Sequence, residues 1–164
     1  MKTQECIIRL IKDSEAPFLK EMLYEALFVP PGESPFPRGI LDTPELKIEY
    51  ENWGHKGDIG VVIEHERHGL IGAGWVRLHS ASQPGYGYIS DDIPELSIAL
   101  KPDFRGTGLG SQLMIRLIDE VRRQGYVGIS LSVDKRNQAM ELYLRLGFEI
   151  VKSEGNPTML LKFT

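Results

Sequence analysis

The sequence predicts a mixed α/β (α+β) fold, in which helices alternate with the strands of one sheet. Two patterns support this class: segments with apolar residues three and four positions apart, and short runs that are apolar at every second position. The length of 164 residues suits one sizeable core, and 41% hydrophobic with 26% charged residues is typical of a globular protein. No repeat, low-complexity run or linker interrupts the pattern, so we expect a single domain over residues 1–164.

The first part of the chain predicts one strand and two helices separated by a rigid loop. A short strand is expected over residues 7–11, followed by a helix over residues 15–28 whose apolar side chains share one face. Four prolines and two glycines between residues 29 and 39 exclude both a helix and a central strand, which leaves a loop. Thr43 then predicts a helix N-cap with Pro44 at the first helical position, and this helix is expected to continue through about Asn52.

The rest of the chain contains most of the expected sheet. Residues 59–64 and 70–78 predict an antiparallel hairpin, and the polar stretch 79–92 predicts a long loop of the kind that is often functional. The later elements are predicted in the order strand 95–100, helix 109–124, strand 127–133, helix 137–146, and a strand pair over residues 148–152 and 158–163.

Composition excludes several classes of function. The formal net charge is −4, which argues against general nucleic-acid binding. No apolar run approaches the roughly 20 residues that span a bilayer, and the N-terminus lacks a hydrophobic signal segment. The single cysteine, Cys6, excludes an internal disulfide framework and fits a reducing compartment, so a cytoplasmic protein is expected.

The most informative stretch is a strand that leads through a glycine-rich turn into a helix. Gly106, Gly108 and Gly110 allow backbone amides to approach a diphosphate closely, and the helix that follows presents unpaired N–H groups. Arg105 adds a charge that can bind phosphate. No Gly-Lys-Ser/Thr follows, which excludes a Walker P-loop, and Ser111 occupies the position where a dinucleotide fingerprint needs glycine. Taken alone, the turn remains open to interpretation as a tight connector.

A second motif gives this turn a context. The pattern Arg105-x-x-Gly108-x-Gly110 follows a strand, and residues 137–148 read Asn-Gln-Ala-Met-Glu-Leu-Tyr-Leu-Arg-Leu-Gly-Phe. Together these motifs resemble the acyl-CoA signature and the second motif of the GNAT superfamily of N-acyltransferases, with a close match over residues 94–148. The resemblance implies a mixed central sheet of six or seven strands flanked by about four helices. Two central parallel strands, here 96–100 and 127–133, would splay apart to hold CoA.

The resemblance also implies a set of cofactor-binding residues for acetyl-CoA as acyl donor. Backbone groups of Ile98, Ala99 and Leu100 would bind the pantetheine, and Asn137 would contact CoA while also capping its helix. The pyrophosphate would be held by the loop that comprises Arg105, Gly106, Thr107, Gly108, Leu109, Gly110 and Ser111. No metal is expected: His65 and His68 flank a hairpin turn without a third ligand nearby, and we interpret them as surface histidines.

The implied reaction is transfer of an acetyl group to a primary amine by direct attack in a ternary complex. An alkylammonium has a pKa near 10.4, so a base or a water relay must take its proton at neutral pH. Glu95 is the candidate base, although a substrate-binding or a solvated carboxylate remains open for it, and Tyr143 would protonate the departing thiolate. Tyr86 and Tyr88 are among the aromatic residues that could line an acceptor pocket.

The acceptor and the assembly state are left open by the sequence. Residues 1–94 contain 9 basic and 15 acidic side chains, a net charge of −6 that favours a cationic amine. Both a small molecule and a protein amine fit, and a homodimer remains open. The alternative class is a non-catalytic acyl-CoA-binding module, which would need neither Glu95 nor Tyr143.

Overall fold

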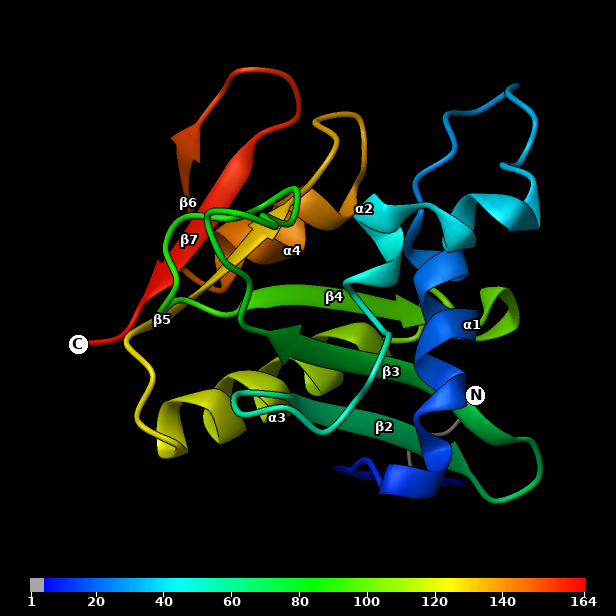
Figure 1. The fold of residues 1–164 in the computed structure, drawn as a ribbon. Helices are drawn as coiled ribbons and strands as arrows, with labels where there is room; N and C mark the ends of the chain where they lie inside the picture. The colour runs from blue at the N-terminus through cyan, green and yellow to red at the C-terminus, as the bar shows by residue number, and fades with distance from the viewer. Residues whose placement is uncertain (1–4) are drawn as a thin grey trace.

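The computed structural model describes residues 5–164 as a single seven-stranded sheet with helices on both faces (Figure 1). The strand order is β1-β2-β3-β4-β5-β7-β6, and every neighbouring pair is antiparallel except β4 with β5. The strands are β1 (Cys6–Leu10), β2 (Ile59–His65), β3 (Gly69–Arg77), β4 (Glu95–Leu100), β5 (Gly128–Ser132), β6 (Glu149–Lys152) and β7 (Thr158–Lys162). The helices are α1 (Pro17–Ala26), α2 (Pro44–Lys47), α3 (Leu109–Arg123) and α4 (Ala139–Arg145), with short 3₁₀ helices at Asp13–Glu15, Arg38–Asp42 and Pro102–Phe104. This architecture confirms the predicted fold class.

The sheet opens between its two parallel strands. Among the described residues, β4 and β5 pair in register only at Glu95 and Ser130, where the Ser130 N–H donates to the Pro94 carbonyl over 3.0 Å. From that pair onward the two strands diverge in Figure 1, β4 toward α1 and β5 toward α4. The expected splay of two central strands is therefore present, with Glu95 at its vertex.

The β4 backbone alternates between its two neighbours. The Lys101 N–H donates to the Ile71 carbonyl of β3, whereas the Pro94 carbonyl accepts from β5. Backbone groups of successive residues in a strand point to opposite sides. The N–H and C=O of Ile98 and Leu100 are therefore directed toward the gap, and those of Ala99 toward β3, where it pairs with Ala73.

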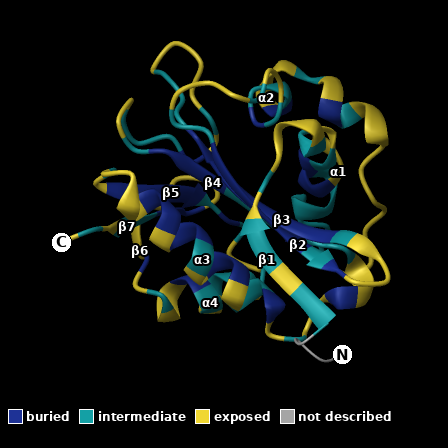
Figure 2. Ribbon diagram, turned by 90° about the horizontal axis from the view of Figure 1, so that it is seen from below, coloured by how far each residue is buried: buried dark blue, intermediate teal, exposed yellow. Residues whose placement is uncertain are grey.

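Each face of the sheet packs against its own hydrophobic core. Helices α3 and α4 cover one face, where Leu113, Leu117 and Val121 of the amphipathic α3 are buried. Helices α1 and α2 cover the other face (Figure 2). There the buried Leu19 and Met22 of α1 form one cluster with strand residues such as Trp75. Among residues 5–164, the helices are too short or too polar to traverse a lipid bilayer.

Several predicted boundaries shift for physical reasons. The first helix begins at Pro17, after a separate 3₁₀ turn, and ends at Ala26. The helix expected to run to Asn52 ends at Lys47, because Arg77 binds the carbonyl oxygens of Ile48 and Glu51, and also that of Asn52, at 2.5–3.2 Å. The interpretation of both hairpin histidines as surface residues is wrong for His65.

His65 is buried and organises the β2–β3 hairpin. Its Nδ1 accepts the backbone N–H groups of Arg67 and His68, and its Nε2 lies 3.2 Å from Glu5 Oε2. A side chain that satisfies turn amides is needed where the hairpin reverses, and no local pattern in the sequence distinguishes His65 from the exposed His68.

Candidate active site

Glu95 lies at the vertex of the sheet opening and is buried by the loop that precedes it. Its residue exposure is only 5%, which excludes a solvated strand-end carboxylate. The Gly87 N–H donates to Oε1 of Glu95 over 2.9 Å. A Cβ at Gly85 would overlap Oε2 of Glu95, and one at Gly87 would come within 2.6 Å of the Leu131 carbonyl carbon. Glycines at these two positions allow the loop to close over the carboxylate.

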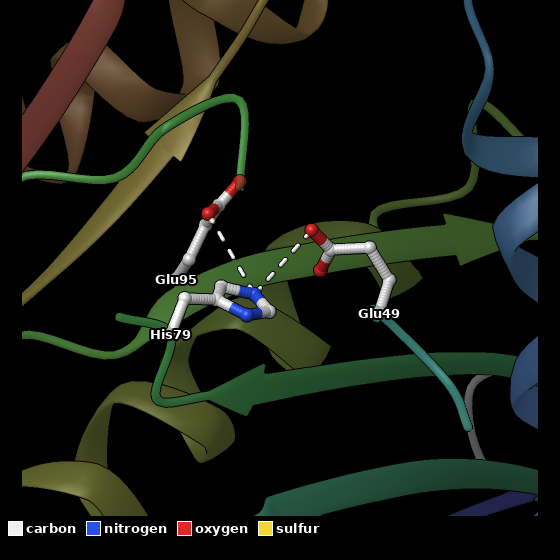
Figure 3. A group of neighbouring side chains, drawn as sticks. All are labelled: Glu49, His79 and Glu95. Carbon is white, nitrogen blue, oxygen red and sulfur yellow. Dashed lines mark ion pairs between the residues drawn. The ribbon is translucent and has the colours of Figure 1, made fainter. Parts of the chain in front are cut away.

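Two further ionisable side chains face Glu95 from different parts of the fold. Glu49 comes from the turn after α2, and His79 follows the end of β3 (Figure 3). His79 Nε2 lies 3.4 Å from Oε1 of Glu49 and 3.8 Å from Oε2 of Glu95, so the imidazole sits between two carboxylates. All three side chains are about 5% exposed. We call Glu49, His79 and Glu95 the acidic cluster.

Sequence reasoning identified only Glu95 of this cluster. Glu49 and His79 belong to no local motif, and a separation of 30 residues carries no spacing signal. One indirect signal exists: His79 begins the polar stretch 79–92, whose length is typical of functional loops.

Burial and mutual repulsion determine how the acidic cluster holds protons. Burial, followed by the negative charge of Glu49, raises the pKa of Glu95 to about 8, although the Gly87 N–H and the charge of His79 act in the opposite direction. For His79, burial lowers the pKa, but contacts with Glu49 and Glu95 outweigh it, so that its pKa is raised overall. Shifted pKa values of buried carboxyl and imidazole groups are typical of groups that transfer protons near neutral pH.

Three buried polar atoms at this vertex have no hydrogen-bond partner among the described residues: Nε2 of His79, Oε2 of Glu95 and Oγ of Ser130. Ser130 is the β5 residue paired with Glu95, so its side chain projects from the same face of the sheet. Buried polar groups are normally satisfied in folded proteins, and exceptions concentrate at functional sites. The vertex therefore offers both hydrogen-bond donors and acceptors to a polar ligand.

A histidine with two carboxylates is also a donor set that divalent cations accept, and the ligand atoms of the cluster lie within 4.8 Å of one another. Without a cation, the contacts with Glu49 and Glu95 raise the pKa of His79, so the same three side chains can also hold a proton between them.

The glycine-rich turn has the geometry of an anion site. Gly106 and Gly108 have φ values of 75° and 84°, which favour glycine, and Gly108 forms the N-cap of α3 without a side-chain cap. Thr107 Oγ1 donates to the Phe104 carbonyl over 2.8 Å and closes the turn. The first amides of α3, including those of Gly110 and Ser111, are therefore left for a ligand.

Arg105 is placed differently from the other loop residues. Its guanidinium bonds to the Leu100 carbonyl and to Oε2 of Glu25, at 3.2 and 3.0 Å, and its backbone N–H donates to Pro102. The side chain, half exposed, ties the turn to the end of β4 and to α1. Sequence reasoning assigned it only a phosphate contact and missed this structural role.

The second predicted motif lies on α4 and just before it. The Asn137 side-chain oxygen accepts the Ala139 N–H over 2.9 Å, but the N-cap of α4 is Gln138, one residue later than expected. Tyr143 is buried, its ring centroid lies 5.9 Å from that of Phe148, and burial raises its pKa to about 12. The hydroxyl is therefore neutral at physiological pH and can donate a hydrogen bond.

An open cavity of about 630 Å³ lies beside the loop that covers Glu95. Tyr86 and Tyr88, the aromatic residues that flank Gly87, line it together with Ser132 and residues 151–154. The two tyrosines thus line a cavity on the loop whose Gly87 N–H binds Glu95, although Glu49, His79 and Glu95 are not among its lining residues. Trp75 is fully buried elsewhere in the core, and its Nε1 donates to the Glu49 backbone carbonyl over 2.7 Å.

Comparison with known proteins agrees with this arrangement. A family model described as the acetyltransferase (GNAT) family matches residues 21–148. Mycothiol acetyltransferase of Thermobifida fusca is 30% identical over 122 residues, which is 71% of this chain and 36% of that protein. The ribosomal protein bS18-alanine N-acetyltransferase of Salmonella typhimurium is 41% identical over 61 residues, 37% of this chain and 41% of that protein.

The fold is similar to that of solved acetyltransferases. A putative acetyltransferase from Salmonella typhimurium, solved with its cofactor acetyl-CoA, superposes with a TM-score of 0.68 at 21% identity and covers 97% of this chain and 94% of that one. The protein belongs to the GNAT family of acetyltransferases. The matched part spans about two fifths or less of the two curated relatives.

Proposed function

We propose that this protein transfers an acetyl group from acetyl-CoA to a primary amine by direct attack in a ternary complex. The observation that carries the proposal is the position of Glu95, a buried carboxylate with an unpartnered oxygen at the vertex where β4 and β5 part. We further propose that the chain forms a single domain, built on one sheet with a hydrophobic core on each face.

The acyl donor would lie along the gap between the two strands. The outward backbone groups of Ile98 and the N–H of Leu100 would bond the pantetheine amides as a neighbouring strand does, while the Leu100 carbonyl already accepts from Arg105 and Ala99 contributes only the strand surface. The pyrophosphate would bind the free amides of the turn and of the first helical residues, from Gly106 to Ser111. Arg105 would mainly hold this turn in place through Glu25.

An ammonium nitrogen has three protons and an amide nitrogen has one, so the reaction must remove two protons from the acceptor. One goes to a base before the attack, and the other, lost as the C–S bond breaks, can reach the sulfur. Glu95 would take the ammonium proton, directly or through water, and a base with a pKa of about 8 is well matched to neutral conditions. The amine nitrogen then attacks the thioester carbonyl, the C–N bond forms, and the C–S bond breaks to release the CoA thiolate.

Tyr143 would stabilise that thiolate. A phenol with a pKa of about 12 transfers its proton to a thiolate only against an unfavourable pKa difference, because the corresponding thiol has a pKa near 8.5. A hydrogen bond from the hydroxyl to the developing thiolate avoids that cost. We therefore favour a hydrogen bond from the Tyr143 hydroxyl to the thiolate during the attack step over full proton transfer. The thiolate would take up its proton as CoA leaves.

The acceptor is proposed to be a cationic amine. Once Glu95 is ionised, two carboxylates face one histidine in the acidic cluster, so the cluster is net negative and an ammonium group is favoured at the vertex. The neighbouring cavity, with Tyr86, Tyr88 and Lys152 in its lining, has room for the rest of a small acceptor or the end of a peptide. Names of the relatives include a protein N-acetyltransferase, which keeps a protein amine within this proposal.

Binding of the acyl donor gives the first test. CoA at 100 times its dissociation constant should raise the free energy of unfolding by about 2.7 kcal/mol, whereas NAD should leave it unchanged. Thermal denaturation with each ligand measures this. Stabilisation by NAD and not by CoA would reject the glycine turn as an acyl-CoA site.

Turnover gives the second test, with Tyr143 as the probe. Replacing it with phenylalanine (Tyr143→Phe) should lower kcat by roughly 10- to 100-fold, the equivalent of one lost hydrogen bond to a charged group, with the KM for acetyl-CoA unchanged. Release of CoA thiol across a panel of amines measures both parameters, and Tyr126→Phe serves as the matched control. Tight acetyl-CoA binding without turnover on any amine would instead support a non-catalytic acyl-CoA-binding module.

A further inference from the structure

We propose that His79 and Glu49 are positioning residues that control the proton on Glu95 from two sides, His79 by favouring the ionised carboxylate and Glu49 by opposing it. The inference rests on the proposed function, in which Glu95 accepts the proton of the acceptor amine. It adds two residues, from separate parts of the chain, to the machinery of that step.

The two oxygens of Glu95 have different surroundings. Oε1 accepts the Gly87 N–H, which fixes the orientation of the carboxylate. Oε2 is buried, has no hydrogen-bond partner among the described residues, and faces His79 Nε2 at 3.8 Å. At that distance the imidazole acts on Glu95 through its charge, and Oε2 stays free for a proton from the substrate.

The charges around Glu95 reduce to one anion and one cation. From its own strand, Ser97 contributes a neutral hydroxyl that lies 3.4 Å from Glu49, and β5 contributes the neutral Ser130. The covering loop contributes a backbone amide. The charges that act on Glu95 itself are those of Glu49, from the turn after α2, and His79, from the end of β3. Arg77, which is paired with Asp58, acts on His79 and lowers its pKa.

Buried hydrogen bonds fix the backbone around Glu49, and His79 lies between the two carboxylates. The Glu49 backbone carbonyl accepts the indole N–H of buried Trp75, and Arg77 binds the carbonyls on both sides of it, at Ile48 and Glu51. Keeping two carboxylates buried side by side is costly unless a cation separates them. His79 lies between them, so it has the position to lower this cost and to keep Glu95 able to ionise near neutral pH.

Removing the cation and removing the anion should therefore shift the pKa of Glu95 in opposite directions. In His79→Gln the cation is lost while Glu49 remains, so ionisation of Glu95 becomes harder. The rise of kcat/KM with pH should move upward by roughly one to two pH units. In Glu49→Gln the repulsion is lost, so the rising part of the profile should move to lower pH. This shift should be smaller than that in His79→Gln, because His79 also loses the carboxylate that contributes most to raising its pKa.

The experiment measures pH profiles of kcat/KM for the amine at saturating acetyl-CoA. The wild type, both variants and two matched controls, His55→Gln and Glu51→Gln, are compared, since these control side chains are exposed and lie outside the acidic cluster. In His79→Gln, kcat/KM at pH 7 should fall about 10-fold for each pH unit by which the limb moves, with most of the high-pH rate retained. Both controls should follow the wild-type profile.

A readout independent of turnover uses the ¹³C resonance of the Glu95 carboxyl, assigned by its absence in Glu95→Gln. The midpoint of its pH titration should move to higher pH in His79→Gln and to lower pH in Glu49→Gln, even if either variant is inactive. Midpoints that stay fixed, or that move in the same direction in both variants, would overturn the inference. Full activity of Glu95→Gln would instead reject Glu95 as the base, which is a failure of the proposed function that the resonance midpoints distinguish.

Discussion

Replacing Glu95 with glutamine is expected to lower kcat/KM for the amine by about 10²- to 10⁴-fold at pH 7–8, the range typical of losing a general base. Glutamine keeps the shape of the side chain and can still accept the Gly87 N–H through its amide oxygen. It cannot take a proton from an ammonium group. The loss should therefore fall on the chemical step and should remove the rise of the rate with pH.

The sign of this pH effect follows from the raised pKa of Glu95. Burial and Glu49 raise its pKa to about 8, so the carboxyl is mostly protonated at pH 7, and the active, ionised form grows as the pH rises through 8. Steady-state rates from about pH 6 to about pH 9.5 cover this limb. The dissociation constant of acetyl-CoA should be unchanged in Glu95→Gln, and a variant that retains more than half of the wild-type rate would contradict the role assigned to Glu95.

The sequence predicts those parts of the site that are formed by consecutive residues. The glycine turn before α3 and the segment around α4 are continuous motifs, because a diphosphate is bound by consecutive amides and by one helix N-terminus. Glu95 was predictable since it begins the strand that leads to this turn. The splay of β4 from β5 followed from the family resemblance, and the structure contains it.

The part that could not be predicted depends on contacts between distant segments. Glu49 reaches Glu95 only because the helix expected to extend to Asn52 stops at Lys47. His79 reaches it because β3 ends two residues earlier, at Arg77. Neither event has a periodic signature in the sequence. The Arg105 side chain shows the same limit, since its contact with Glu25, eighty residues away, could not be predicted, while its phosphate contact stays a prediction.

Arg77 connects the stability of the fold to the geometry of the site. Its side chain is 6% exposed, and its guanidinium bonds in two places to the Asp58 carboxylate, at 2.9 and 3.0 Å. It also donates to the carbonyls that follow α2, including those of Ile48 and Glu51. These carbonyls flank Glu49, so one buried cation fixes the turn that carries a member of the acidic cluster.

Replacing Arg77 with methionine is expected to lower the free energy of unfolding by about 3–5 kcal/mol, because Asp58 and several buried carbonyls would lose their charged partner. Urea denaturation measures the change, and Arg123→Met is the control. The Arg123 side chain is 70% exposed and pairs with Glu120 on the same helix, so its loss should cost less than about 1 kcal/mol. Equal losses in the two variants would show that Arg77 contributes no more than a surface ion pair. Arg77→Met should also loosen the turn that carries Glu49. In the folded fraction of this variant, the rise of the rate with pH should therefore shift in the same direction as in Glu49→Gln.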